Sequence, residues 1–427
     1  MAAEGRQSRL TPVTVAAVER LPHSGVRHTG RVLRLRLGLP RWVVAALLSI
    51  AALLLAGCGG GASGASAQFS PQPNFLGGNG GPNPQLPNPG MPQPSLSASA
   101  PGGPAPSSGA TGSSAPAADP NVVASKLVEP TGLVVLPDGT ALVGERRSGR
   151  IYRIVPNSSA SAQLVQTLPG VDGSGDGGLL DLAISPSYAE DGLIYAYLTT
   201  ATDNRVVHFP IGSAPSPVIA GIPRGLDGNV GRIAFDATGA LLIGTGDAGN
   251  PALARSMTSL AGKILRTDDI GQPASDNPDP ASPVYARGFT EVDGLCVDPQ
   301  RGTRMAVTGD KIQLIRPGLD YAGLAPAATL PAALAGGGGC ALAGNQLAVA
   351  TATGQALAVA PVGSTDSKIG TFQAAVARKY GRLRTVVFGS DGAIWLTTRN
   401  RDGHGQPVPA DDRVIRLTEL NSTGSVL

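Results

Sequence analysis

Arg382 and Arg384 stand two residues apart in the segment G-R-L-R-T-V-V-F. In a β-strand, side chains at positions i and i+2 project from the same face, so both guanidinium groups are expected on one side. Two neighbouring guanidinium groups could bind a carboxylate-rich ligand through paired N–H donors. The alternative is that both are surface arginines at the start of an edge strand, and the spacing does not separate the two interpretations.

Histidines and metal-binding patterns are scarce in the rest of the sequence. His208 lies in the apolar segment R-V-V-H-F, which favours a packing role, whereas His404 lies in the polar loop R-D-G-H-G-Q-P and is expected in solvent. Loops that begin at Asp172 and Asp276 could hold calcium through oxygen ligands, although aspartate is also common in tight turns. The sequence contains no G-x-S-x-G motif, P-loop or Cys/His cluster, which argues against the common hydrolases, nucleotide hydrolases and zinc sites.

These residues lie within six repeated segments of similar plan. Each has a short apolar strand, a turn rich in Gly or Asp, a second apolar strand and, in most, a weaker third. A repeat with several strands per unit and almost no helical periodicity is typical of a β-propeller. We therefore predict an all-β fold, a six-bladed β-propeller over residues 120–427. A seventh blade in the longest repeat and a β-sandwich are the alternatives. The segments begin at Gly132, Asp181, Arg232, Gly294, Cys340 and Thr385.

The polar segment T-G-D-A-G-N, residues 245–250, follows the second strand of the third repeat. At the same place the first repeat has V-G-E-R-R-S-G-R and the sixth has L-T-T-R-N-R-D-G. The position is therefore a repeated corner that is elaborated in some blades. We interpret it mainly as a structural corner, and it is also a candidate for the rim of a site.

The first 57 residues have the pattern of a secretory signal. Arginines precede the apolar run Trp42–Gly57, which is shorter than the roughly 20 residues of a membrane-spanning helix. The run ends in L-A-G-C, which resembles the lipobox of bacterial lipoproteins and predicts lipidation of Cys58. A transmembrane anchor is the alternative. Residues 58–119 are rich in Gly, Ser and Pro with one charged residue, Asp119, and this composition predicts a disordered linker.

The charge balance argues against nucleic acid as a partner. Residues 1–57 hold eight of the 33 Lys and Arg and two of the 30 Asp and Glu. The remainder has 25 basic and 28 acidic residues, a net charge of −3, and so offers no basic surface by composition. The expected location is extracytoplasmic, with the lipid on Cys58 holding the chain to the outer face of the plasma membrane.

Cys296 and Cys340 each lie in the first strand of a repeat, in adjacent units. Two cysteines in one domain outside the cytoplasm can form a disulfide. If first strands line the centre of the propeller, the two would be close enough to bridge. Two buried free thiols are the alternative.

Several of the repeated segments resemble the soluble glucose/sorbosone dehydrogenases, which are six-bladed propellers that use pyrroloquinoline quinone (PQQ) with calcium. The resemblance runs from about Pro130 to Leu417 and is most specific from Gly231 to Arg266. It implies the same fold as the repeats. The segments that carry it include P-D-G-T-A-L-V-G-E-R-R-S-G-R-I, G-R-I-A-F-D-A-T-G-A-L-L-I-G-T-G-D-A-G-N, A-G-K-I-L-R-T and G-R-L-R-T-V-V-F-G-S-D-G-A-I-W.

The family's catalytic base has no counterpart at the matching position. In the family it is a histidine three residues before the G-R-L of the third repeat. That position is Gly228 here, and the adjacent Asp227 is the candidate substitute. Removal of a positioned base typically costs 10²–10⁴-fold in rate, so the resemblance implies a weakened or lost sugar-oxidising site.

The family's cofactor contacts match in part. The resemblance implies that Arg382 and Arg384 meet the quinone, and that Asp176 replaces the family's polar residue before G-G-L-L. The family's G-H-R-N, with its quinone-binding arginine, aligns with Gly288–Glu291. Its calcium-linked segment aligns with residues 310–313, where we assign no metal ligand.

We interpret the chain as a cell-envelope lipoprotein whose dehydrogenase-like propeller binds a ligand or partner, such as a glycan or an envelope protein. The alternative is a divergent PQQ-dependent sugar or aldehyde dehydrogenase acting outside the plasma membrane. A calcium-dependent lactonase, with Glu129 as a metal ligand, is a third and weaker possibility.

Overall fold

A computed structural model describes residues 119–156, 162–365 and 367–418. The predicted signal peptide, Cys58 and the greater part of the predicted linker lie outside these residues. Within them, no helix has the length and apolar character needed to cross a bilayer.

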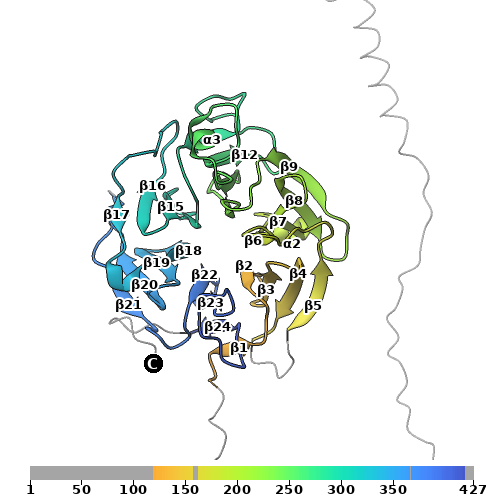
Figure 1. Ribbon diagram of the computed structural model, residues 1–427, viewed down its shortest axis with the longest axis vertical. Coiled ribbons are helices and arrows are strands. Elements are labelled where there is room, and N and C mark those ends of the chain that lie inside the picture. Colours follow the sequence, from red (N-terminus) through yellow and green to blue (C-terminus); the bar gives the residue numbers. More distant parts are fainter. Residues whose placement is uncertain (1–118, 157–161, 366, 419–427) are drawn as a thin grey trace, which may run out of the picture. The chain divides into compact units, whose positions relative to one another are not determined.

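Six four-stranded antiparallel sheets are arranged around a central axis (Figure 1). This confirms the predicted six-bladed β-propeller. Blade 1 is β2 (Pro130–Val135), β3 (Ala141–Glu145), β4 (Arg150–Ile154) and β5 (Gln163–Thr167), and blade 2 is β6 (Leu179–Ile184), β7 (Leu193–Thr199), β8 (Asn204–Pro210) and β9 (Ser216–Ile222). Blade 3 is β10 (Gly231–Phe235), β11 (Leu241–Thr245), β12 (Lys263–Thr267) and β13 (Val284–Arg287), and blade 4 is β14 (Gly294–Val297), β15 (Arg304–Thr308), β16 (Lys311–Leu314) and β17 (Ala328–Thr329).

The last two blades complete the ring. Blade 5 is β18 (Gly337–Ala343), β19 (Gln346–Thr351), β20 (Ala356–Pro361) and β21 (Gln373–Ala375), and blade 6 is β22 (Leu383–Phe388), β23 (Ile394–Thr398), β24 (Val414–Leu417) and β1 (Val122–Ala124). Strand β1 pairs with β24, Val122 opposite Ile415, so strands from both ends of the domain share one sheet and close the ring. Short helices α2 (Tyr188–Asp191), α3 (Pro251–Arg255) and η1 (Ala332–Leu334) lie in the connections.

The longest repeat holds no seventh blade. Blade 3 instead uses its extra length for α3 and for the connection between β12 and β13. Asn250 caps α3, its side chain accepting a hydrogen bond from the backbone N–H of Ala252, and so turns the T-G-D-A-G-N corner into a helix start. The corner therefore lies where the sequence placed it, directly after the second strand of its blade.

Apolar clusters fill the spaces between neighbouring blades. One cluster joins Leu142 and Ile151 of blade 1 to Leu179 and Leu182 of blade 2. Glycine permits this close approach, because a Cβ added at Gly144 would lie 2.6 Å from Leu179 Cδ2. Strands covered on both faces in this way are expected to be nearly continuous apolar runs, as the repeats are.

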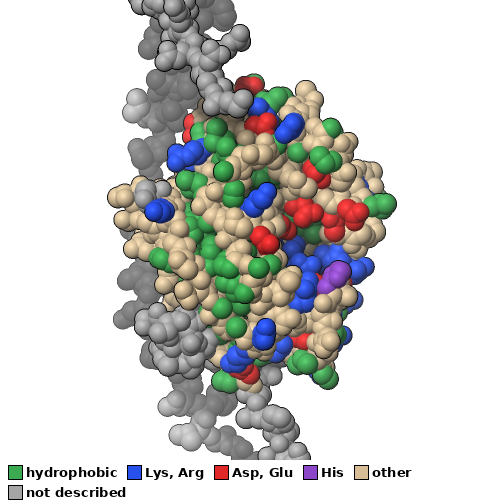
Figure 2. Space-filling view, turned by 60° about the vertical axis from the view of Figure 1, so that its left-hand side comes forward, with side chains coloured by type: hydrophobic (Ala, Val, Ile, Leu, Met, Phe, Trp, Pro, Cys, Tyr) green, Lys and Arg blue, Asp and Glu red, His purple; other side chains and the backbone are tan. Residues whose placement is uncertain are grey.

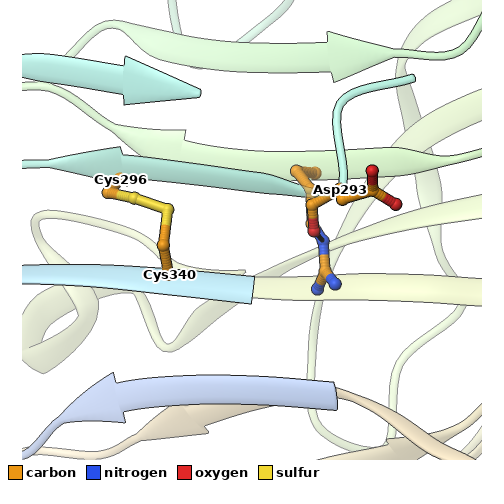
Figure 3. Close-up of a disulfide and its surroundings, with 4 residues drawn as sticks. Asp293, Cys296 and Cys340 are labelled. Carbon is orange, nitrogen blue, oxygen red and sulfur yellow. Dashed lines mark hydrogen bonds between the residues drawn. A yellow bond between two sulfur atoms is a disulfide. The ribbon is translucent and has the colours of Figure 1, made fainter. Parts of the chain in front are cut away.

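The innermost strands β2, β6, β10, β14, β18 and β22 surround a central channel. Cys296 in β14 and Cys340 in β18 are joined by a disulfide across two adjacent blades, with their Cα atoms 5.6 Å apart (Figure 3). Asp293 lies at the opposite end of the same innermost strand, just before β14 begins. The channel thus has two different ends, and the charged end carries the candidate site.

Candidate functional site

A cavity of about 410 Å³ opens where the innermost strands begin, and we call it the central pocket. The starts of these strands converge there, so loops from five blades contribute side chains. Its lining residues are Glu129, Pro130, Thr131, Arg146, Arg147, Gly175, Asp176, Leu180, Asp227, Val230, Glu291, Asp293, Arg384, Arg399, Asp402 and His404.

Glu129 is held by ion pairs within the pocket wall. Its carboxylate lies 2.6 Å from a guanidinium nitrogen of Arg146 and 2.8 Å from Nε of Arg147. Arg146 also donates to the backbone oxygens of Gly175 and Gly177, which links the first corner to the loop before β6. Both charges of Glu129–Arg146 are therefore engaged in building the wall, and a calcium-ligand role for Glu129 would require these bonds to break.

Arg382 and Arg384 line different cavities, so the expectation of one shared face is not met. Arg384 lines the central pocket, whereas Arg382 lines a neighbouring cavity and donates to Asp402 Oδ2 at 2.9 and 3.1 Å. The physical reason is local. Arg382 lies before β22, and the pairing of β22 with β23 shifts between Leu383 and Thr385, so regular alternation does not hold there.

Arg384 is the one arginine of the central pocket that is left without a partner among the described residues. Its partly buried guanidinium forms no hydrogen bond or ion pair with any of them. Burial, reinforced by Arg232 and Arg399 nearby, lowers the pKa of Arg384 well below its usual range. A ligand oxygen that accepts from this guanidinium would relieve its desolvation.

Asp176 lines the pocket but uses its carboxylate to hold the loop before β10. Its oxygens accept from the backbone N–H of Gly228 at 2.7 Å and from the side-chain amide of Asn229 at 2.6 Å. Asp227, by contrast, is exposed at the pocket rim and has no hydrogen-bond partner for its carboxylate among the described residues.

Gly228 occupies a position that only glycine fits. Its φ is +72°, in the left-handed region, and an added Cβ would lie 2.6 Å from the backbone nitrogen of Gly249 and 2.9 Å from Asp247 Oδ1. The T-G-D-A-G-N corner therefore packs directly against the place where the resemblance puts a histidine. A side chain at residue 228 would have to displace that corner.

Glu291 is a functional candidate that the sequence analysis did not single out. It lines the central pocket, and its carboxyl group has no hydrogen-bond partner among the described residues. Burial, followed by the charges of Asp293, Asp176 and Asp247, raises its pKa to about 7, while Arg384 acts in the opposite direction. Its sequence signals are an acidic residue in the corner between the last strand of blade 3 and the first strand of blade 4, and its place at the end of the segment that aligns with the family's G-H-R-N.

The other expected residues lie away from the pocket or in structural roles. Asp172 accepts from the backbone N–H of Ser174 and from Arg224, and Asp276 pairs with Arg266. His208 packs against Tyr195, with ring centroids 5.5 Å apart. Across the described ranges, no group of three or more His, Cys, Asp or Glu side chains is placed to hold a metal ion.

Comparison with known proteins agrees with this architecture. The family model described as glucose/sorbosone dehydrogenase matches residues 127–324. The aldose sugar dehydrogenase YliI of Escherichia coli is 26% identical over 226 residues, which are 47% of this chain and 60% of that protein. The chain thus spans a little over half the length of the curated relatives it matches, since the quinoprotein glucose dehydrogenase B of Acinetobacter calcoaceticus is covered to 52%.

Solved structures are matched over almost their whole length. The PQQ-bound aldose sugar dehydrogenase of Streptomyces coelicolor is 37% identical, with a TM-score of 0.64, and the match covers 69% of this chain and 95% of that one. A Thermus thermophilus oxidoreductase described as a glucose dehydrogenase is 32% identical, with a TM-score of 0.63 and coverage of 69% and 98%. On its six blades, its matched segments and these two relatives, the chain belongs to the glucose/sorbosone dehydrogenase family.

Proposed function

We propose that this chain is an extracytoplasmic, lipid-anchored binding protein whose central pocket takes a carbohydrate without oxidising it by the family's histidine chemistry. The observation that carries the proposal is Gly228. Its positive φ and the contact with Gly249 leave no room for a base at the matching position. Asp227 is one residue away and exposed at the rim, so it is not held against a substrate in the pocket.

The charges of the central pocket suit PQQ poorly. Four arginines line it against six carboxylates, those of Glu129, Asp176, Asp227, Glu291, Asp293 and Asp402. Three of the arginines already pair with Glu129 or Asp402, which leaves only Arg384 for a quinone that carries several carboxylates. The remaining acidic side chains would repel such an anion. We therefore assign no catalytic step that passes through the cofactor.

A carbohydrate satisfies the same set of side chains without a charge mismatch. Each sugar hydroxyl both donates and accepts a hydrogen bond. The carboxylate of Glu291 can accept from a sugar hydroxyl, and Arg384 can donate to a hydroxyl or ring oxygen. Hydrogen bonds to charged groups contribute about 1.5–3 kcal/mol each, so a few of them support useful affinity for a neutral ligand. The cavity of about 410 Å³ also falls within the usual range for small-molecule sites.

Lipid attachment gives this pocket its place in the cell. The L-A-G-C segment ending at Cys58 and the Gly/Ser/Pro-rich residues after it support an anchor and spacer that hold the propeller near the outer face of the plasma membrane. Cell-envelope glycans would then be within reach. A protein partner that presents hydroxyl groups is the other ligand class consistent with this placement.

Calorimetric titration of neutral sugars into the full chain tests the carbohydrate site. Arg384→Gln should weaken binding by about 10–100-fold, because a hydrogen bond from a charged donor is lost. Arg150→Gln is the matched control, since Arg150 is exposed on blade 1 outside the pocket. Equal affinity in all three proteins, or no binding by any of a broad sugar panel, would overturn the proposal.

A divergent PQQ-dependent dehydrogenase is the second candidate, and two observations favour it. The Streptomyces coelicolor relative is a PQQ-bound enzyme. Glu291, with a pKa raised to about 7, has the property expected of a general base near neutral pH. A ligand at 100 times its Kd adds about 2.7 kcal/mol of stability. If PQQ and calcium raise Tm by an amount that corresponds to this gain in stability, and Arg384→Gln abolishes the increase, this candidate would be favoured over the binding protein.

A further inference from the structure

A second cavity, of about 430 Å³, adjoins the central pocket in blade 6, and we call it the basic pocket. His404 lines both cavities, so they are neighbours on one face. Figure 2 shows basic side chains gathered around a histidine on one face, with acidic side chains beside them. The basic pocket is lined by Gln355, Arg378, Lys379, Tyr380, Gly381, Arg382, Asn400, His404, Gly405, Gln406, Val408, Asp411 and Arg413.

The basic pocket concentrates positive charge in an acidic domain. Four cationic side chains line it, those of Arg378, Lys379, Arg382 and Arg413. Three of them pair with carboxylates, those of Asp119, Asp402 and Asp411, so Arg378 carries the charge that no carboxylate offsets. Residues 58–427 as a whole have 25 basic and 28 acidic residues. The cluster is therefore a local arrangement and does not follow from overall composition.

Three of the four cations are oriented by fixed partners. Lys379 Nζ lies 3.1 Å from Asp119, Arg413 Nε lies 2.7 Å from Asp411, and Arg382 pairs with Asp402. The charged groups of Lys379 and Arg413 also lie 5.1 and 5.6 Å from the ring centroid of buried Tyr380. These contacts fix the positions of the remaining N–H donors of each cation. Donors that are already fixed lose less conformational entropy when a ligand binds.

Arg378 has no such partner. Its exposed guanidinium forms no hydrogen bond or ion pair with any described residue. Its backbone is in the left-handed region at φ +59°, two residues after Val376 at φ +48°, and its N–H donates to Gln355 at 2.7 Å. Non-glycine residues held at positive φ cost free energy and gather at functional sites. Arg378 is thus an unpaired cation in a strained backbone conformation at the edge of the basic pocket.

We propose that the basic pocket binds the oxyanion group, a phosphate or a carboxylate, of the carbohydrate that occupies the central pocket. That the ligand carries a sugar rests on the proposed function. That it carries an anionic group rests on the basic pocket alone. Guanidinium and ammonium donors recognise phosphate and carboxylate through short, charge-assisted hydrogen bonds. The shared His404 places the two parts of one ligand side by side. The ligand class is thus an anionic sugar or the anionic end of a glycan.

Calorimetry on the full chain at low salt tests this with four probes: inorganic phosphate, glucose, glucose 6-phosphate and glucuronate. The anionic sugars should bind at least about 10-fold more tightly than glucose, and the preferred one identifies the oxyanion as phosphate or carboxylate. The double variant Arg378→Gln with Lys379→Gln should lose this gain and saturable binding of inorganic phosphate, while binding of glucose is unchanged. Both side chains are exposed, so an unchanged melting temperature is expected to show that the variant folds.

Two outcomes separate this inference from the proposed function. If phosphate and both anionic sugars bind the double variant as tightly as the wild type, or do not bind either protein, the basic pocket is not an oxyanion site. If phosphate binds and depends on Arg378 and Lys379 but glucose binds neither protein, the anion site stands and the carbohydrate proposal fails. Arg150→Gln serves again as the control for a general loss of positive charge.

Discussion

The two ends of the central channel are built from the same six strands and differ in chemistry. The central pocket, where the strands begin, is lined mainly by charged side chains. Toward the other end the channel forms a cavity of about 630 Å³ with largely apolar side chains, among them Val135, Phe235, Leu342 and Phe388. Arg232, buried between the two, lies 3.6 Å from Asp181 and donates to the backbone oxygen of Asp293.

This difference reflects where each end takes its side chains from. The apolar end uses the strands themselves, whose residues must pack between blades. The charged end uses corners that follow second strands and precede first strands, such as those at Glu129, Asp176 and Glu291, which lie outside the ladders. Corners can therefore vary in chemistry without loss of the fold, as expected for loops on a rigid scaffold. The predictions below test whether the two ends are as independent as this implies.

The largest effect is expected from restoring a histidine at the charged end. Gly228→His should lower the free energy of unfolding by about 2–5 kcal/mol, from left-handed backbone strain and overpacking against Gly249 and Asp247. Gly239→His is the matched control. Gly239 also has positive φ, +82°, but lies in the β10–β11 turn with nothing within 4 Å of an added Cβ.

Denaturant unfolding of the two variants separates strain from crowding. The control should cost about 1–2 kcal/mol, the backbone term alone. A Gly228→His protein as stable as Gly239→His would mean that the corner moves easily. In that case the position could accept the family's base after all, and the argument from Gly228 would be lost.

The second effect concerns the apolar end, where the disulfide joins β14 to β18. Replacing Cys296 and Cys340 by Ala should cost about 2–4 kcal/mol, because the bond closes a loop with a sequence separation of 44. Ligand affinity at the charged end should be unchanged. The bond itself is checked by alkylation and mass spectrometry before and after reduction. Two cysteines that alkylate without reduction would show that the thiols are free.

Much of the fold could be predicted from the sequence because the same strand–turn–strand pattern recurs in six repeats. A turn that contains glycine, such as those at Gly139 and Gly239, follows each first strand, and apolar runs flank it. The closing strand β1 was not foreseen. It has only three residues, and its pairing with β24 depends on the ring bringing both ends of the domain together. Neither its short length nor its pairing with β24 produces a pattern that can be recognised in the local sequence.

The site was less accessible, because its properties arise between blades. Spacing placed Arg382 and Arg384 on one face, but a shift in strand pairing that no spacing rule reveals sends them into different cavities. Glu291 acquires its raised pKa from burial, from its neighbour Asp293, and from Asp176 and Asp247, which lie in other corners. The sequence could show that the family's histidine is absent at residue 228, but not that the site is closed to one.

The smallest effect is a pH dependence that distinguishes the charged end from the rest of the domain. The pKa of Glu291 is raised from 4.5 to about 7, so the folded state holds a proton that the unfolded state releases. The resulting stability is full below pH 4.5 and is lost as the pH rises through about 7. The loss should be on the order of 1 kcal/mol, since the carboxyl is partly solvated, or about 2 °C in Tm.

Glu291→Gln should remove the part of the pH dependence of stability that comes from Glu291, and the part that comes from Asp412 should remain. Asp412, buried in blade 6 away from the central pocket, has a pKa raised to about 6 and loses stability in the same direction as the pH rises. Thermal unfolding of wild type and variant between pH 5 and 8 should therefore give two curves that converge toward low pH and separate above neutrality. Parallel curves would mean that Glu291 titrates normally. The charged end would then lack the protonated carboxyl that could donate to a sugar oxygen at mildly acidic pH, and its difference from the apolar end would lie in fixed charges alone, with Arg384 as the unpaired donor.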